Sequence, residues 1–137
     1  MRHRHSGYKL GRTAPHRKAL LRNLFRSLIR HERIETTHTK AKALKSYADR
    51  QLAKARAGST AARRAVYTAL ANDRKAARKL FDVVLPRYDN REGGFVRIIP
   101  RGFRKGDGAE VSYVELCEMG DEFAEPRVIK LKKKITE

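Results

Sequence analysis

The chain has 137 residues, which is the size of one domain or of one domain with tails. Lys and Arg number 33 against 15 Asp and Glu, so the formal net charge is +18, and only 7% of residues are aromatic. This composition argues against a typical small-molecule enzyme, whose pocket needs aromatic lining, and indicates a polyanionic partner.

Other classes of protein are excluded by equally simple features. The one cysteine, Cys117, cannot form an intramolecular disulfide or a Cys-based zinc site, and we expect it to be a buried or half-buried hydrophobe. No apolar segment follows the basic start as in a secretory signal, and no apolar run approaches the ~20 residues of a membrane span. We therefore expect a reducing compartment, with the cytosol as the default.

The charge is distributed unevenly along the chain. Residues 1–31 contain nine Lys or Arg, and the first acid is Glu32. Residues 106–125 contain seven acids and no Lys or Arg. A solvated disordered arm is one interpretation of the basic start, but a nucleic-acid-binding arm is the interpretation that we favour.

The first third of the chain predicts an arm, a helix and a strand. Residues 1–13 have no apolar period and predict an extended basic arm. Pro15 suits the first turn of a helix that continues to about His31. Its apolar residues recur three and four positions apart, and a basic stripe lies opposite them. The apolar positions are Leu21, Leu24, Phe25, Leu28 and Ile29, and the basic ones are Lys18, Arg22, Arg26 and Arg30. Residues 32–37 are rich in β-branched types and predict a short strand.

Three further helices are predicted in the middle of the chain. The first runs over about residues 40–57, capped by Thr39 and ended by Gly58. The second begins at Ser59 or Thr60. The third is capped by Asn72 or Asp73 and ends near Pro86, because the residue before proline resists the helical conformation.

The last third predicts a β-hairpin. Residues 86–94 form a loop, residues 95–101 and 111–117 form two strands, and residues 102–109 connect them. Residues 118–137 form a charged tail that we expect to be flexible. The fold class is α+β, with about four helices packed beside a small two- or three-stranded antiparallel sheet. We divide the chain into an arm (1–13), a globular domain (14–117) and the tail.

Aromatic and histidine side chains suggest further roles. Tyr8, Phe95 and Phe103 lie near basic residues and would stack on nucleic-acid bases, whereas the core is the better place for Tyr47, Tyr67 and Phe81. The five histidines are weak candidates for a metal site, because none lies beside a cysteine. A small ribonuclease that uses His16 and His31 as acid and base is an alternative function. A further alternative is a nucleic-acid-binding protein of another kind, such as a nucleoid protein.

A series of motifs resembles a known family. The opening residues Met1-Arg2-His3, His16-Arg17 and Asn23 begin the series, and Arg30-His31-Glu32, Thr36-Thr37 and Lys40-Ala41-Lys42 follow. Lys79-Leu80-Phe81, Pro86-Arg87-Tyr88, Arg91-Glu92-Gly93-Gly94-Phe95, Gly106-Asp107 and Glu115-Leu116 complete it. In order and spacing, residues 1–117 resemble the bacterial-type large-subunit ribosomal protein seventeen family.

The resemblance implies a structural constituent of the large ribosomal subunit that acts in translation. Such a protein binds and stabilises folded large-subunit ribosomal RNA near the peptide exit side, contacts neighbouring large-subunit proteins, and has no enzymatic activity and no cofactor. It also implies that the strand at residues 34–37 joins the hairpin. We expect a cytoplasmic location, with an organelle ribosome left open, and no membrane or small-molecule partner.

Charge and motifs together select the residues that we expect to bind RNA. They comprise cations of the arm, the first helix and the hairpin, with hydroxyl and ammonium groups around the start of the second helix. The set is Arg2, His3, Arg4, Lys9, Arg12, His16, Arg17, Lys18, Arg22, Arg26, Thr36, Thr37, Lys40, Lys42, Arg63, Arg64, Arg97, Arg101 and Arg104.

Overall fold

The structure is a computed structural model that describes residues 7–118. The helices are α1 (Ala14–His31), α2 (His38–Arg56), α3 (Thr60–Ala69) and α4 (Arg74–Lys79), followed by a π-helical turn η1 (Leu80–Val84) and a 3₁₀ turn η2 (Leu85–Tyr88). The strands are β1 (Arg33–Thr37), β2 (Val96–Phe103) and β3 (Glu110–Leu116). Arg2, His3, Arg4 and the expected tail beyond Glu118 lie outside the described residues.

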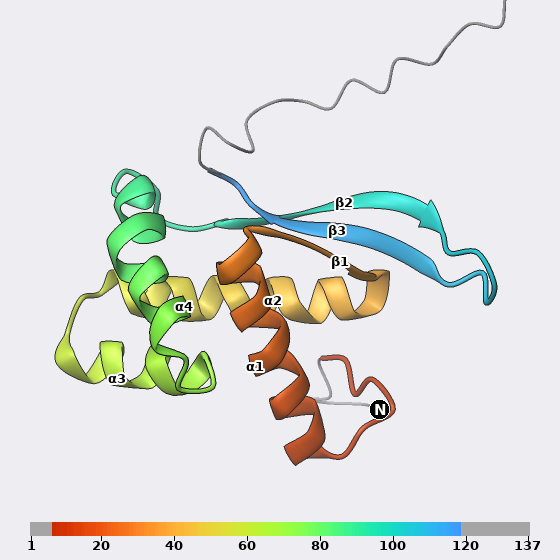
Figure 1. The fold of residues 1–137 in the computed structure, drawn as a ribbon, viewed down its shortest axis with the longest axis horizontal. Helices are drawn as coiled ribbons and strands as arrows, with labels where there is room; N and C mark the ends of the chain where they lie inside the picture. Colours follow the sequence, from red (N-terminus) through yellow and green to blue (C-terminus); the bar gives the residue numbers. More distant parts are fainter. Residues whose placement is uncertain (1–6, 119–137) are drawn as a thin grey trace, which may run out of the picture.

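The predicted α+β class is confirmed. The three strands form one antiparallel sheet in the order β1-β3-β2, so β3 is the central strand. Ile34 of β1 and Ile98 of β2 both lie opposite Val114 of β3, which confirms that the first strand joins the hairpin. Figure 1 shows α2 running along one face of this sheet, with α1 crossing it and α4 on the side away from the hairpin turn.

The core is built around α2, the inner face of the sheet, α1, α3 and the segment from α4 to η2. Alternate residues of each strand point to one face, where Val96, Val114 and Leu116 are buried and Ile34 and Ile98 are half-buried. On α2, buried residues recur at intervals of three and four, which places them on one side of the helix. Three of them are alanines, so the helix can approach the sheet closely. The buried α2 positions are Ala41, Leu44, Ala48, Leu52 and Ala55.

The start of α2 differs from the prediction. The helix begins at His38, and Thr37 is its N-cap, with an extended backbone at φ −63° and ψ 147°. The predicted cap, Thr39, lies inside the first turn. Strand β1 therefore leads directly into α2, because Thr37 ends one element and begins the other. The Thr37 hydroxyl makes no capping hydrogen bond.

The region around Pro86 also differs, since residues 86–88 were expected to be loop. The helical path continues through η1 and η2 as far as Tyr88. Pro86 lies in the first turn of η2, where no backbone N–H is required of it, and the π-helical turn just before it changes the hydrogen-bond register. The path buries Tyr88, whose ring lies 5.1 Å from that of Phe95, and burial raises the pKa of Tyr88 to about 12.

Two buried or half-buried carboxylates connect the elements. Asp49 of α2 accepts hydrogen bonds from the backbone N–H groups of Phe95 (3.0 Å) and Val96 (3.2 Å), which holds β2 against the helix. Glu32 lies at the C-cap of α1 with a left-handed φ of 58° and is 3% exposed. Its carboxylate pairs with Arg87 at 2.8 Å and Lys79 at 3.2 Å.

Candidate nucleic-acid interface

The described part of the arm folds back as a turn. The Arg12 N–H donates to the Lys9 carbonyl at 3.2 Å, and Leu10 has a left-handed φ of 56°. The Arg12 guanidinium donates to the Leu10 carbonyl at 2.9 Å. The Arg17 guanidinium reaches the carbonyls of Lys9 (3.5 Å) and Arg12 (3.4 Å). Two of the expected RNA-binding arginines therefore also hold the turn against the start of α1.

The expected basic stripe on α1 is not one uniform solvent face. Lys18 is exposed, Arg22 and Arg26 are half-buried, and Arg30 forms an ion pair with Asp73 at the start of α4. Arg22 lies close enough to Tyr47 of α2 for its positive charge to act on the Tyr47 hydroxyl. Burial raises the pKa of Tyr47, and the positive charge of Arg22 opposes that rise.

The start of α2 presents cations that no carboxylate neutralises. Lys40 is half-buried and Lys42 is exposed, and neither has an ion pair with any residue between 7 and 118. His38 of the first turn hydrogen-bonds the Ser112 hydroxyl at 2.8 Å, which fixes this end of the helix to β3. Thr36, expected to offer its hydroxyl to RNA, lies opposite Ser112 on the inner face and is half-buried.

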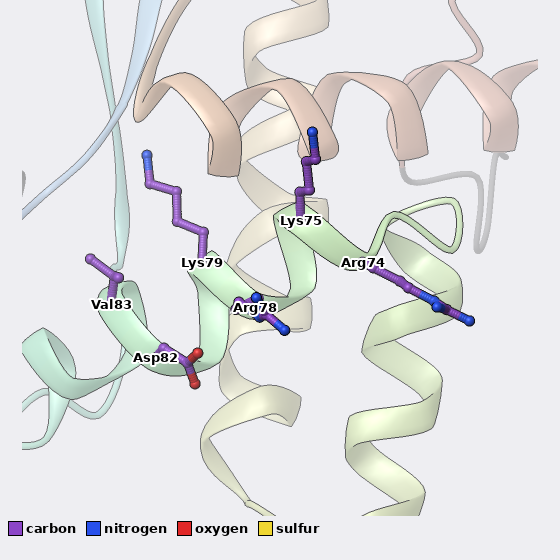
Figure 2. A pocket seen from close by; sticks show the side chains of 6 residues that line it. All are labelled: Arg74, Lys75, Arg78, Lys79, Asp82 and Val83. Carbon is purple, nitrogen blue, oxygen red and sulfur yellow. The ribbon is translucent and has the colours of Figure 1, made fainter.

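A basic pocket near α4 was missed by the sequence analysis. It has a volume of about 440 Å³, and Figure 2 shows Lys75 and Lys79 extending from α4 toward α1. The sequence signal was present, since four of the six residues of α4 are Lys or Arg. The residues that line the pocket are Arg74, Lys75, Arg78, Lys79, Asp82 and Val83. On the neighbouring α3, Arg64 is exposed, and the Arg63 guanidinium lies 5.1 Å from the centre of the Phe81 ring.

The hairpin arginines expected to bind RNA differ from the expected cations of the helices, because each of the three has an acidic partner among the described residues. Arg97 pairs with Glu115, Arg101 with Glu35, and Arg104 with Asp107. Glu115 is only 1% exposed and also lies 3.5 Å from Arg33. The guanidinium of Arg33 lies 4.0 Å from the centre of the Tyr113 ring, and that of Arg101 lies 5.6 Å from it. This outer face of the sheet is therefore an internally neutralised array.

The aromatic residues expected to stack on bases are not all accessible. Tyr8 is 45% exposed and Phe103 is 79% exposed, but Phe95 is 2% exposed, so its expected stacking role is wrong. Phe95 follows the loop glycines and packs against Tyr88 in the core, which sequence proximity to basic residues did not reveal. Cys117 is half-buried, as expected, and its thiol lies 3.2 Å from the Gly94 carbonyl.

The ribonuclease alternative fails on geometry. His16 and His31 lie near opposite ends of the same helix, and the rise of an α-helix puts them about 22 Å apart. They cannot act on one phosphodiester together. No trio of His, Cys, Asp or Glu side chains in the described range is placed to hold a metal ion. None of the helices in that range is long and apolar enough to span a bilayer.

Comparison with known proteins agrees with the motifs. The family described as "Ribosomal protein L17" matches residues 20–117. The large ribosomal subunit protein bL17 of Acidobacterium capsulatum is 46% identical over 127 residues, which cover 93% of this chain and 79% of that protein. Its counterpart in Koribacter versatilis is 49% identical over 116 residues, covering 85% and 71%. That of Campylobacter concisus is 47% identical over 116 residues, covering 85% and 98%. The chain therefore belongs to the ribosomal protein L17 family.

Proposed function

We propose that this protein is a structural constituent of the large ribosomal subunit that binds and stabilises folded large-subunit ribosomal RNA. It acts in translation, in the cytoplasm, beside neighbouring large-subunit proteins. Family membership supports the ribosomal role. The observation that supports RNA as the direct partner is the separation of neutralised from unneutralised cations on the surface.

The neutralised and the unneutralised cations lie on different elements of the fold. Among residues 7–118, the expected RNA-binding cations between Lys9 and Arg64 have no carboxylate partner, whereas Arg97, Arg101 and Arg104 each have one. Phosphate replaces a missing carboxylate as the counter-charge, and each contact releases cations condensed on the nucleic acid. The phosphate-binding surface is therefore formed by the arm, the exposed side of α1 and the first turns of α2.

This proposal divides the expected site into two groups. Arg2, His3 and Arg4 extend the arm and contribute phosphate contacts or pack on RNA. The direct contributors in the described part are Lys9, His16, Lys18, Arg26, Lys40, Lys42 and Arg64. Arg12, Arg17 and Arg22 position the arm and α1 as well as carrying charge. The paired hairpin arginines contribute little to the salt dependence.

Two double variants of equal charge test this division. Lys40→Gln with Lys42→Gln removes two unpaired cations, and Arg101→Gln with Arg104→Gln removes two exposed, paired cations. We expect the first pair to lower the slope of log affinity for large-subunit RNA against log salt by about one unit per lost contact. The second pair should leave the slope close to that of the unmodified chain.

Sedimentation of a cell lysate tests the ribosomal role itself. The protein should migrate with large subunits and remain there after a moderate salt wash. Migration near the top of the gradient, or affinity for duplex DNA equal to that for ribosomal RNA, would contradict the proposal and favour a nucleoid-type protein. Equal slopes for the two double variants would show that the surface is assigned wrongly.

A further inference from the structure

Phe103 is more exposed than Tyr8, Val83 or Ile99, the other exposed large hydrophobic side chains of the described residues. The exposed fraction of Phe103 is 79%. A single exposed apolar residue is ordinary on a protein surface. The position of Phe103 requires an explanation, because β2 contains an irregularity in its pairing just before this residue.

A β-bulge decides which side of the sheet the ring faces. The register of β2 on β3 shifts between Pro100 and Gly102, and Gly102 has a φ of 125° that a residue with a side chain rarely adopts. After the shift Phe103 lies opposite Glu110. Glu110 and Ser112 are two residues apart on β3, so they lie on the same face of the sheet, which is the inner face toward α2. Without the bulge, Phe103 would lie on the outer face.

The ring lies beyond the part of the sheet that the helices cover. The last pair between β1 and β3 is Thr37 opposite Val111, and α2 begins at the next residue, His38. The Phe103 pair is one step farther out along β3, beyond the end of β1. Figure 1 shows the hairpin turn extending past this end of α2, at the same end of the molecule as the arm.

The hairpin tip is braced by its own hydrogen bonds. The Arg104 N–H donates to the Ala109 carbonyl at 2.8 Å, and the Gly108 N–H donates to the Arg104 carbonyl at 3.1 Å. Asp107 accepts from both the Arg104 guanidinium and the Ala109 N–H. A ring carried on a braced turn loses little conformational freedom when a ligand covers it.

Local charge argues against the tip as a phosphate site. Arg104 is neutralised by Asp107, Arg101 is neutralised by Glu35, and Glu110 faces Phe103 across the strands. Lys105 is an exposed cation on the turn. The chemistry offered at this position is therefore an aromatic face, next to the unpaired cations at the start of α2.

We propose that Phe103 is a stacking platform for an unpaired base of the large-subunit ribosomal RNA, while Lys40 and Lys42 bind the backbone nearby. This inference rests on the proposed function and names the kind of nucleotide that the hairpin contacts. Bases in single-stranded loops and bulges are free to stack on aromatic side chains, and every base offers a suitable face.

Fluorescence gives a direct test, because the chain contains no tryptophan. Phe103→Trp introduces a single emitter at the tip, and Ile99→Trp introduces one on the same strand as a matched control. We expect ribosomal RNA to quench the emission of Trp at position 103 and to shield it from acrylamide. Emission from position 99, on the outer face, should change much less.

Binding measurements separate this inference from the proposed function. Phe103→Ala should lower the affinity for the RNA by about ten-fold without changing the salt slope, and Phe103→Tyr should retain most of the affinity. Normal, salt-dependent binding by Phe103→Ala, with unquenched emission from Phe103→Trp, would overturn the stacking role and leave the function standing. Quenching that requires another ribosomal protein instead of RNA would also overturn it. Failure of the unmodified chain to bind RNA would contradict the function.

Discussion

At the scale of single residues, Glu32 is the position in the described chain where a substitution should disturb the most interactions. It combines a left-handed backbone, a buried carboxylate and ion pairs to Arg87 and Lys79. Its N–H donates to the Leu28 carbonyl at 2.7 Å, and its carbonyl accepts from the Leu116 N–H at 3.0 Å. One residue therefore ends α1 and joins it to the sheet, α4 and η2.

Replacement of Glu32 should be costly. Glu32→Gln leaves Arg87 and Lys79 without their shared carboxylate, and removing one partner from a buried ion pair lowers the free energy of unfolding by about 3 kcal/mol. Urea denaturation followed by circular dichroism would measure this loss. Glu118→Gln, which removes an exposed carboxylate 3.5 Å from Arg91, is the matched control and should cost about 0–1 kcal/mol. Equal losses for the two variants would show that burial does not govern these pairs.

At the scale of elements, the fold depends on how α2 is fixed to the sheet. Apolar packing gives the contact its strength, but Asp49 fixes its register. One carboxylate oxygen accepts from the N–H groups of Phe95 and Val96, where β2 begins, at 3.0 and 3.2 Å. The other oxygen accepts from Lys45 at 3.1 Å, and Lys45 also reaches the Val96 carbonyl at 3.0 Å. This small polar cluster sets where the hairpin begins along the helix.

Asp49→Ala should weaken this attachment. Phe95 and Val96 would each lose a charged acceptor, so we expect the free energy of unfolding to fall by about 3 kcal/mol and the exchange protection of both amides to fall with it. Asp49→Asn keeps one acceptor oxygen and should lose less. Asp82→Ala removes an exposed acid and serves as the control. Unchanged protection of the two amides in Asp49→Ala would rule out the proposed register role.

Sequence patterns predicted well those features that depend only on residues close by in the chain, such as the helix caps. The expected helix starts are found, with Ser59 and not Thr60 as the cap of α3 and Asp73 and not Asn72 as the cap of α4. A capping side chain contacts backbone groups only two or three residues away, which is why local sequence predicts it. The rule for the residue before Pro86 failed, because it assumes a continuing α-helix and the chain adopts a π turn followed by a 3₁₀ turn.

The site was less predictable, because its chemistry depends on pairing across long distances in the sequence. Charge counting placed Arg101 among the phosphate ligands, but its partner Glu35 lies 66 residues away, and no local pattern joins them. The basic cluster on α4 was visible in the sequence as a run of cations, yet its pocket depends on how α4 lies relative to neighbouring elements. The arm and the start of α2 remain predictions that RNA binding must test.

At the scale of the whole molecule, a net charge of +18 on 137 residues disfavours the compact state when no polyanion is present. The ion pairs of the sheet relieve this repulsion locally, but the cations of the arm, α1, α2 and α4 repel one another. The free protein should therefore be less stable than the same fold bound to RNA, because binding supplies the missing negative charge.

Ionic strength provides a simple test of this balance. Raising KCl from about 10 to about 150 mM shortens the screening length from about 30 to about 8 Å, so repulsion between distant cations should fall more than attraction within contact pairs. We expect the thermal midpoint of the free protein to rise by about 5 °C. A midpoint that falls with salt would mean that the attraction within ion pairs contributes more to the stability of the free protein than the repulsion between its cations does. Chloride is used because sulfate would also bind as an anion.

The contacts of Glu32 have a consequence for the speed of unfolding. Its partner Arg87 lies 55 residues away in the chain, and its backbone partner Leu116 lies still farther. Closing such long loops costs chain entropy before the contacts form, so we expect these contacts to form after the local helices and the hairpin. Removing these contacts should therefore raise the unfolding rate more than it lowers the folding rate. We therefore expect Glu32 to slow the unfolding of the free protein, so that the folded state persists longer before RNA binds.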